Sequence, residues 1–254
     1  MASTDGWSPA VYGRFARDRE APFDDLLALL TPAPGGSLLD LGCGTGALTA
    51  KAHAQLQTGS ALGLDSSAAM LSAASSPGVR LERRDIETAL PDARFDRVIS
   101  NSAFNWVANH GSYLPRVLSC VAPGGQLAVQ MPSNPGTAFS DCALEVAAAF
   151  TSELDGYVYR SPVESPEFYA ELLARDARVT RSRVGTWRYS QVHASSHGIA
   201  QFAQGGLLSA YRARLSAEDF TRFVAAYRAA LRRRLGDGPV FFAFRRVFLF
   251  AECT

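Results

Sequence analysis

The chain has 254 residues, which is long enough to bury a hydrophobic core in one large domain. Its 25 basic and 24 acidic side chains leave a net charge of +1, so no overall charge favours nucleic acid, a membrane surface or acidic partners. No run reaches the roughly 18 apolar residues of a membrane span, and no signal peptide is visible, so we expect a soluble, cytoplasmic protein.

The four cysteines are scattered along the chain. They are Cys43, Cys120, Cys142 and Cys253, and none belongs to a CxxC pair. We therefore expect no metal site and no disulfide scaffold, which fits a reducing compartment.

Short apolar runs alternate with helical patterns between residues 37 and 131. The predicted strands are Leu38–Leu41, Ala61–Leu64, Arg80–Arg83, Arg97–Ser100 and Gln126–Met131, the last after a turn at Pro123-Gly124-Gly125. The predicted helices are Ala47–Gln57, Ala68–Ala74 and Tyr113–Val121. This alternation predicts right-handed βαβ units and a mainly parallel α/β sheet, with ligands at the carboxyl ends of its strands.

The rest of the chain has a different pattern. Helices are predicted at Ala138–Phe150 and Pro166–Ala174, extended segments at Val179–Arg183 and Trp187–Val192, a long helical stretch at Ser195–Leu235 and a β-rich run at Val240–Ala251. A helical stretch placed before a final strand is suited to act as a lid, here at about residues 195–236, that packs on the core.

The strongest local signal is the run Leu39-Asp40-Leu41-Gly42-Cys43-Gly44-Thr45-Gly46, which follows a buried strand and opens a helix. Glycines let the backbone approach a ligand closely, and amides at a helix start hold an anion such as a carboxylate. Asp65 ends the second strand, about 20 residues onward, where an acidic group meets ribose hydroxyls. Asp85 can receive an adenine amino group while Ile86 packs on the ring.

Two other interpretations of this loop are possible. A dinucleotide loop of a nicotinamide-dependent oxidoreductase usually carries a third glycine where Ala47 stands, which argues against that class. The other alternative is a plain glycine turn with two surface aspartates, Asp65 and Asp85.

The loop, Leu64-Asp65-Ser66-Ser67 with Met70-Leu71, and Asp85-Ile86 together resemble the core of class I methyltransferases. The resemblance implies a mostly parallel, seven-stranded, doubly wound (Rossmann-like) sheet with a helical lid. It also implies S-adenosyl-L-methionine as cofactor and S-adenosyl-L-homocysteine as its product. The cofactor-binding residues it implies are Asp40, Gly42, Cys43, Gly44, Asp65, Ser66, Met70, Asp85, Ile86, Asn101 and Ser102.

Outer motifs resemble the trans-aconitate methyltransferase family more narrowly. They are an N-terminal array (Trp7, Pro9, Tyr12, Phe15, Arg19 and Pro22), Ser100–Trp106 with His110, Leu127–Pro132 with Asn134, and Phe244, Arg245 and Phe248 near the end. The resemblance implies methyl transfer to a carboxylate. It also implies an N-terminal helical cover (residues 1–36), a cofactor-binding core (residues 37–135) and a remainder with the last strands and the lid (residues 136–254).

In that family the N-terminal cover would bring Tyr12 and Arg19 near the methionine end of the cofactor or the substrate. The alternative is that Trp7 and Phe15 only fasten the segment to the body. The chain departs from the family at Gly206-Leu207, which is followed by Leu208-Ser209 instead of an Arg-Pro pair. Since arginine suits bidentate carboxylate binding, Leu208 favours a less anionic, more apolar acceptor than aconitate.

Four residues are predicted to be catalytic: His110, Asn101, Trp106 and Tyr12. A carboxylate is ionised at neutral pH, so it needs alignment and exclusion of water but no general base. The segment from Asn101 to Trp106 is expected nearest the transferred methyl, with Trp106 either an aromatic wall or a core residue. A phenol, nitrogen or alcohol acceptor would need a base, and His110 is then the first candidate.

The remaining basic residues have modest predictions. His193 and His197 follow His110 as candidate bases, although a lone histidine is more often structural, and His53 is expected to face solvent. Arginines of the helical stretch are predicted to be mainly a solvated face, with one or two available to an acidic substrate. They are Arg212, Arg214, Arg222, Arg228, Arg232, Arg233 and Arg234, while Tyr211, Phe220, Phe223 and Tyr227 have core spacing.

The leading hypothesis is thus an S-adenosylmethionine-dependent carboxyl O-methyltransferase of a small molecule. Its rivals are a malonyl-carrier-protein O-methyltransferase, for which a carrier protein is the partner, and a natural-product N- or O-methyltransferase. A nicotinamide oxidoreductase and a cofactor-binding protein without catalysis are the other classes. No nucleic-acid or membrane partner is expected.

Overall fold

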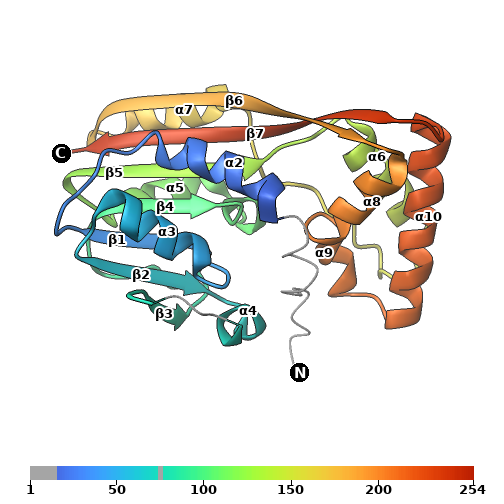
Figure 1. Ribbon diagram of the computed structural model, residues 1–254, viewed down its shortest axis with the longest axis horizontal. Helices are drawn as coiled ribbons and strands as arrows, with labels where there is room; N and C mark the ends of the chain where they lie inside the picture. The colour runs from blue at the N-terminus through green and yellow to red at the C-terminus, as the bar shows by residue number, and fades with distance from the viewer. Residues whose placement is uncertain (1–15, 74–76) are drawn as a thin grey trace. The chain divides into compact units, whose positions relative to one another are not determined.

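The computed structural model describes residues 16–73 and 77–254, and they form two compact units (Figure 1). The sheet unit consists of Arg17–Pro132, Ser161–Trp187 and Arg246–Thr254. The helical unit consists of the stretches Ser133–Arg160 and Arg188–Arg245. Segments distant in sequence therefore build each unit together.

The sheet has seven strands within the described residues, in the order β3-β2-β1-β4-β5-β7-β6. Their bounds are Ser37–Leu41 (β1), Ser60–Asp65 (β2), Arg80–Arg83 (β3), Phe95–Asn101 (β4), Val121–Pro132 (β5), Val179–His193 (β6) and Val240–Cys253 (β7). Strands β1 to β5 pair in parallel, and β7 is antiparallel to β5. The predicted mostly parallel, seven-stranded, doubly wound sheet is confirmed.

Helices flank the sheet and build the helical unit. The helices that begin in or belong to the sheet-unit segments are Ala16–Leu27 (α2), Ala47–Leu56 (α3), Ala68–Ser72 (α4), the short 3-10 helix Phe104–Trp106 (η1), His110–Leu118 (α5) and Pro166–Arg175 (α7). The helical unit holds Ala138–Ala149 (α6), Ser196–Gln204 (α8), Ser209–Arg212 (α9) and Ala217–Leu235 (α10). In Figure 1, α2 and α3 lie in front of the strands and α5 lies behind them.

Serine side chains begin several of these helices. The hydroxyls of Ser67, Ser165 and Ser216 accept a hydrogen bond from the amide three residues onward, which satisfies one orphan donor at each helix start. The predicted strands and helices of the first half are confirmed, but several of their boundaries differ. The helix predicted from Tyr113 begins at His110, and the strand predicted from Gln126 begins at Val121. The helix predicted at Tyr113–Val121 ends at Leu118, because Val121 already pairs with Phe95 as the first residue of β5.

The turn predicted at Pro123-Gly124-Gly125 lies inside β5 as a wide bulge. Phe95 pairs with Val121, but Arg97 pairs with Gln126, so five residues of β5 advance the register while β4 advances two. Gly124 has φ +74°, which permits the turn. After the bulge, every residue from Gly125 to Met131 is buried.

Two further predictions about the second half need correction. The long helical stretch Ser195–Leu235 is three helices, because the chain turns at Gly205-Gly206 and again before the cap at Ser216. The two extended segments predicted at Val179–Arg183 and Trp187–Val192 are one continuous strand, β6.

Each unit has its own apolar core. In the sheet unit, alternate residues of the strands pack against α5 and α7, with Tyr113 and Tyr169 among the largest buried side chains. In the helical unit, α6, α8 and α10 enclose a core rich in aromatic rings, including a stacked pair of Tyr211 and Phe223. Full burial of such a side chain stabilises the fold by about 1.5–3 kcal/mol.

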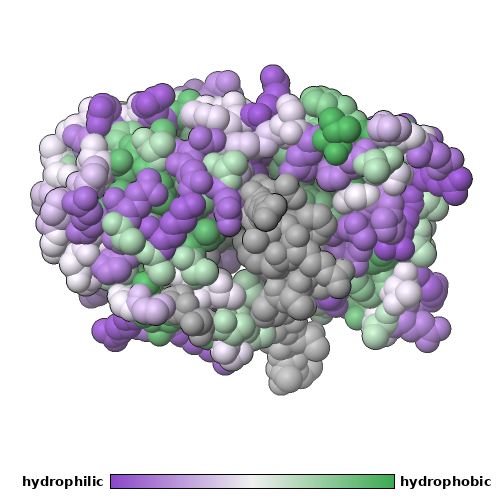
Figure 2. Space-filling view, in the orientation of Figure 1, coloured by the Kyte–Doolittle hydropathy of each residue, from purple (hydrophilic) through white to green (hydrophobic). Residues whose placement is uncertain are grey.

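Charged side chains cover the outer surface of α10. Figure 2 shows hydrophilic side chains gathered over α10, whose last turn carries Arg232, Arg233 and Arg234, each paired with a carboxylate. In the described part of the chain, no helix has both the length and the apolar character needed to cross a membrane. The four cysteines are buried free thiols.

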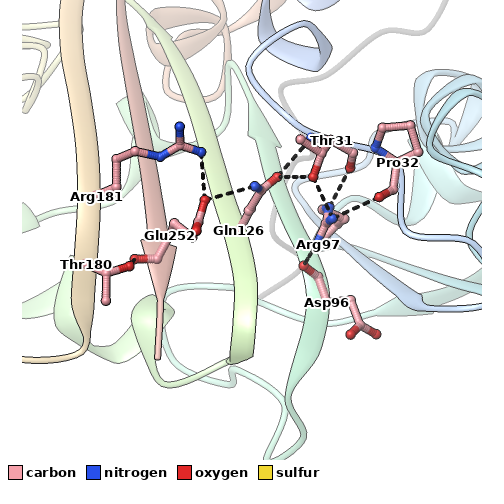
Figure 3. A network of polar contacts seen from close by, with 8 residues as sticks. All are labelled: Thr31, Pro32, Asp96, Arg97, Gln126, Thr180, Arg181 and Glu252. Atoms are coloured by element: carbon pink, nitrogen blue, oxygen red, sulfur yellow. Dashed lines mark hydrogen bonds and ion pairs between the residues drawn. The ribbon is translucent and has the colours of Figure 1, made fainter.

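A buried arginine fixes the amino-terminal edge of the sheet (Figure 3). Arg97 is 7% exposed, and its Nε donates to the carbonyl of Thr31 at 2.7 Å. Its Nη2 donates to Thr31 Oγ1 at 2.9 Å and to the carbonyl of Pro32 at 3.1 Å, and its Nη1 donates to the carbonyl of Asp96 at 2.6 Å. Burial lowers the pKa of Arg97, while the charges of Asp96 and Glu252 raise it.

The same network extends across the sheet through β5 and β7. Gln126 Oε1 accepts from the amide of Thr31 at 2.9 Å, and its Nε2 donates to Glu252 at 3.2 Å, which also pairs with Arg181 at 2.7 Å (Figure 3). We call these residues, centred on Arg97, the amino-edge network. They tie the segment before β1 to four strands, which are β4, β5, β7 and β6.

Candidate active site

The predicted binding residues lie at the carboxyl ends of the parallel strands. The strand order places β2 and β3 on one side of β1, and β4 and β5 on the other. The chain reverses its winding between β1 and β4, and ligands of open α/β sheets bind at such a switch point.

The glycine loop between β1 and α3 is held against two other strand ends. Gly42, Gly44 and Gly46 have φ of +83°, +58° and +76°, a region that favours glycine. The amides of Gly42 and Cys43 donate to the carbonyl of Leu64 at 2.8 and 2.9 Å. A Cβ on Gly42 would lie 2.1 Å from the Cβ of Ala103, so no larger residue fits there.

The carboxyl group of Asp40 is buried beside this loop, and only one of its two oxygens has a hydrogen-bond partner. The residue is 3% exposed, and its Oδ2 accepts from Thr49 Oγ1 at 2.6 Å. Its Oδ1 has no hydrogen-bond partner in the described structure. Burial raises the pKa of Asp40 from 3.8 to about 7, opposed by the Thr49 hydrogen bond and reinforced by the charge of Asp65. A ligand ammonium group would complement this oxygen.

Asp65 is anchored to the loop by backbone amides. Its Oδ2 accepts from the amide of Gly44, and its Oδ1 accepts from the amide of Ser67, both at 2.8 Å. Met70 is buried behind the same loop, with its Cε 3.1 Å from the position of a Cβ on Gly44. Ser66 is exposed, and its carbonyl accepts from Arg83 Nε at 3.2 Å.

Asp85 and Ile86 follow β3 and occupy different environments. Ile86 is buried, and its Cδ1 lies 4.0 Å from the position of a Cβ on Gly42, so it borders the loop. Tyr113 fixes it by donating to the Ile86 carbonyl at 3.0 Å. Asp85 is exposed and accepts from the amide of Glu87 at 2.9 Å, which places it at the rim.

Cys43 packs inside the loop. Its Cβ and Sγ lie 2.8 and 2.9 Å from the position of a Cβ on Gly63, so the thiol fills the space over β2. Burial is the largest of several causes that raise the pKa of Cys43, and the thiol therefore stays protonated near neutral pH.

A second polar group lies at the end of β4 and on β5 and β7, and we call it the carboxyl-edge network: Asn101, Ser102, Gln130 and Arg246. Ser102 has φ +59°, a left-handed conformation that costs a non-glycine residue about 1–2 kcal/mol. Its amide donates to the carbonyl of Gln130 at 2.8 Å. Gln130 Nε2 donates to Ser102 Oγ at 2.9 Å and also to Asn101 Oδ1.

Arg246 completes the network from β7. Its Nη1 donates to Ser102 Oγ at 2.9 Å and to Gln130 Oε1 at 3.0 Å, and the residue is 4% exposed. Trp106 lies in η1, where it is half-buried instead of joining the core as its neighbour Phe104 does.

His110 is placed in the core, and this geometry favours the structural alternative. Its Nε2 donates to the carbonyl of Phe104 at 2.9 Å, and its Nδ1 accepts from the hydroxyl of Tyr169. Both ring nitrogens are therefore engaged. Burial lowers the pKa of His110, which keeps the ring neutral. A role as general base would require breaking one of these buried bonds.

The other histidines are also accounted for by local contacts. His53 was expected to face solvent, but it is half-buried and its Nδ1 is 2.6 Å from Thr58 Oγ1. His193 Nε2 is 3.1 Å from Gln191 Oε1, and His197 is exposed.

Part of the predicted N-terminal array lies outside the described residues. This holds for Trp7, Pro9, Tyr12 and Phe15, and also for the side chain of Arg19. Pro22 is described and is buried within α2. The predicted catalytic role of Tyr12 stays a prediction.

In the helical unit, Leu208 is fully buried in the aromatic core. The expectation of a more apolar acceptor assumed that this side chain lines a binding site, and its burial removes that basis. Among the arginines, Arg222 pairs with Asp219 and Glu153. Arg212 instead lies over the ring of Phe220 at 4.5 Å, with its Nε buried and without a hydrogen-bond partner in the described residues.

Three residues of the site carried no assigned role in the sequence prediction: Thr49, Gln130 and Arg246. Thr49 is nine residues after Asp40 in the sequence. The two side chains meet because the chain turns between β1 and α3. Arg246 had a weak signal, because Arg245-Arg246 interrupts a β-rich run. Adjacent strand residues face opposite sides of a sheet, so one of the two must point inward.

The sequence of this chain is similar to those of known methyltransferases. Residues 33–170 match a family model described as a methyltransferase domain. The chain is 36% identical to a trans-aconitate 2-methyltransferase of Deinococcus radiodurans, with 96% of this chain and 97% of that protein covered. It is 34% identical to another, from Methylobacterium nodulans, with 98% of each covered.

The solved structure of phosphoethanolamine N-methyltransferase 2 from Haemonchus contortus, in complex with S-adenosyl-L-methionine, shares the fold. Its TM-score is 0.57 at 15% identity, over 92% of this chain and 53% of that one. The sheet order, the loop and these matches define an S-adenosylmethionine-dependent methyltransferase. Within that class, the chain belongs to the trans-aconitate 2-methyltransferase family.

Proposed function

We propose that this protein transfers a methyl group from S-adenosylmethionine to a carboxylate of a small organic acid, giving a methyl ester. The observation that carries the proposal is the grouping of the glycine loop, Asp40, Asp65 and the Asn101-Ser102 turn at one switch point of the sheet. The names of the related proteins support an acid as acceptor and make trans-aconitate the first compound to test.

We assign the cofactor's contacts to the loop side of the site. The loop and the start of α3 present backbone amides to the cofactor's carboxylate, and Asp40 Oδ1 accepts from its ammonium group. Asp65 and Asp85, at adjacent strand ends, take the ribose and the adenine amino group, with Ile86 against the ring. The bound cofactor supplies a methyl group already activated on a sulfonium, so the protein's task is alignment.

The family resemblance implies cofactor contacts for Asn101 and Ser102, but we assign their side of the site to the acceptor instead. A carboxylate has a pKa of about 4 and attacks without losing a proton, so the absence of a general-base role for His110 is compatible with this acceptor. Positioning and exclusion of water would supply most of the acceleration.

The direct test is to incubate the protein with methyl-labelled S-adenosylmethionine and a panel of carboxylic acids, phenols and heterocycles. Label that mild base releases as methanol indicates an ester and supports the proposal. Base-stable label on a phenol or a nitrogen would replace it with a natural-product methyltransferase. Ester formation only on an acid tethered to a carrier protein would replace it with a carrier-protein methyltransferase.

Asp65→Ala gives an independent test of the cofactor assignment. We expect the affinity for S-adenosylhomocysteine, measured by calorimetry, to fall at least tenfold, because the carboxylate also shapes the loop. Unchanged affinity would remove Asp65 from the site.

A further inference from the structure

The direction of every hydrogen bond in the carboxyl-edge network follows from Arg246. A guanidinium group can only donate, so Gln130 Oε1, 3.0 Å from Nη1, must be the acceptor. The amide orientation of Gln130 is thereby fixed, and its Nε2 points to Ser102 Oγ and Asn101 Oδ1 as a donor.

Ser102 Oγ consequently receives two donors, one from Gln130 at 2.9 Å and one from Arg246 at 2.9 Å. A hydroxyl oxygen has two lone pairs, and both are used. Its proton is therefore directed away from the network. Because one of the two donors is a cation, the hydroxyl is polarised and becomes a stronger donor.

Exposure to solvent increases along the network from Arg246 to Ser102. Gln130 and Arg246 are buried, whereas Asn101 and Ser102 are half-buried. Ser102 is thus the end of the network from which a ligand can be reached. The next residue, Ala103, lies against the glycine loop, because its Cβ would clash with any side chain at Gly42. Ser102 is therefore the sequence neighbour of a residue that contacts that loop.

Ser102 is also held in a conformation that serine rarely adopts. Its left-handed φ of +59° is maintained by three bonds to Gln130 and Arg246, and strained backbone of this kind clusters where precise positioning matters. A serine needed only to end a strand would not require a buried arginine to orient it.

We propose that the Ser102 hydroxyl donates a hydrogen bond to the carboxylate of the methyl acceptor. Arg246, acting through Ser102 and Gln130, is the positioning residue that fixes the direction of that hydroxyl. One carboxylate oxygen is thereby held while the other is left to attack the methyl group. The inference rests on the proposed function, because it needs an acceptor that accepts a hydrogen bond at its reacting group.

The test compares Ser102→Ala, Arg246→Met and the double variant in steady-state assays with the acid that wild type methylates. Each single variant is expected to lower kcat/KM for the acceptor about tenfold, the worth of one charge-assisted hydrogen bond. The double variant should lose little more than either single variant, since both remove the same interaction. Arg246→Lys, which keeps a donor, should recover part of the loss.

Binding and folding controls separate this role from a structural one. S-adenosylhomocysteine affinity, measured by calorimetry, should stay within threefold of wild type in Ser102→Ala. Ser102→Gly relieves the strained φ and should unfold at a higher temperature than Ser102→Ala, yet be equally impaired. Arg97→Lys, at the other buried arginine of the sheet, should lower the unfolding temperature without changing kcat/KM.

The outcomes distinguish the two proposals. If wild type forms no base-labile product with any acid, the proposed function fails. If wild type forms the ester and Ser102→Ala retains full kcat/KM, the function stands and the Ser102 inference is overturned. Additive losses in the double variant would overturn the role of Arg246 as the residue that orients Ser102.

Discussion

Arg97 and Arg246 are both buried in the sheet unit, but they stand at opposite edges of the sheet and have different partners. Arg97 donates to three backbone carbonyls and one hydroxyl, so its hydrogen bonds fasten one part of the backbone to another. Arg246 donates to two side chains, Gln130 and the half-buried Ser102, and Gln130 in turn donates to Ser102. A buried arginine can thus fasten a fold or direct a functional group, and its acceptors reveal which.

Replacing Arg97 is expected to have the largest effect on stability. Arg97→Met removes all four hydrogen bonds that Arg97 makes with Thr31, Pro32 and Asp96, at a cost of about 2–4 kcal/mol in the free energy of unfolding. Urea denaturation measures this loss. Arg246→Met, the matched change at the other edge, should cost less and should affect turnover instead. Equal losses of stability would break the distinction between the edges.

Two glycines with similar backbone angles sharpen the comparison. Gly42→Ala, at the carboxyl edge, places a methyl group 2.1 Å from Ala103 and should weaken S-adenosylhomocysteine binding at least thirtyfold, or about 2 kcal/mol. Gly35→Ala, just before β1, has φ +74° and open space around its Cβ, so it adds only backbone strain. It should lower stability and leave affinity unchanged in calorimetry. Loss of affinity in both variants would mean that backbone strain, and not the contact with Ala103, causes the weaker binding.

The raised pKa of Asp40, about 7, predicts how cofactor binding depends on pH. Below pH 7 the carboxyl group must lose a proton before it can attract the cofactor's ammonium group. Affinity for S-adenosylmethionine should therefore rise up to tenfold per pH unit toward pH 7 and level off above it. Titration calorimetry from pH 5.5 to 8.5 would measure this slope. Asp40→Asn should abolish it.

The same shift has the opposite sign for the stability of the unliganded protein. The folded state holds the Asp40 proton more tightly than the unfolded state, whose pKa is near 3.8. This contribution to stability is complete below that pH and is lost as the pH rises through about 7. Asp40→Asn should remove this part of the pH dependence of urea denaturation.

The smallest effect is expected at His110. His110→Gln removes a buried contact with Tyr169, so the unfolding temperature should fall by a few degrees. The kcat for a carboxylic acid should stay within twofold, since that acceptor needs no base. A loss of a hundredfold or more, in protein that is still folded, would restore His110 as a catalytic base.

Local patterns predicted most of the fold and the position of the candidate binding residues at one edge of the sheet. The alternation of apolar runs, the glycine spacing and the acids at strand ends are all set by neighbouring residues, so Asp40, Gly42, Asp65 and Ile86 could be placed at this edge from sequence. The start of β5 at Val121 was missed because the turn at Pro123-Gly124-Gly125 marks a bulge inside the strand and not its beginning.

The carboxyl-edge network depends on contacts that sequence spacing does not contain. Arg246 reaches Ser102 across 144 positions only because β7 returns antiparallel to β5. Burial also decided two interpretations that composition left open. Leu208 is a core residue and not a sign of an apolar acceptor, and His110 bonds to a tyrosine 59 positions away.

The late arrival of Arg246 has a consequence for biosynthesis. The glycine loop, Asp65 and Asp85 all precede β4 in the chain, whereas Gln130 and its partner Arg246 are 116 positions apart. The carboxyl-edge network can therefore form only after β7 has been synthesised and has paired with β5.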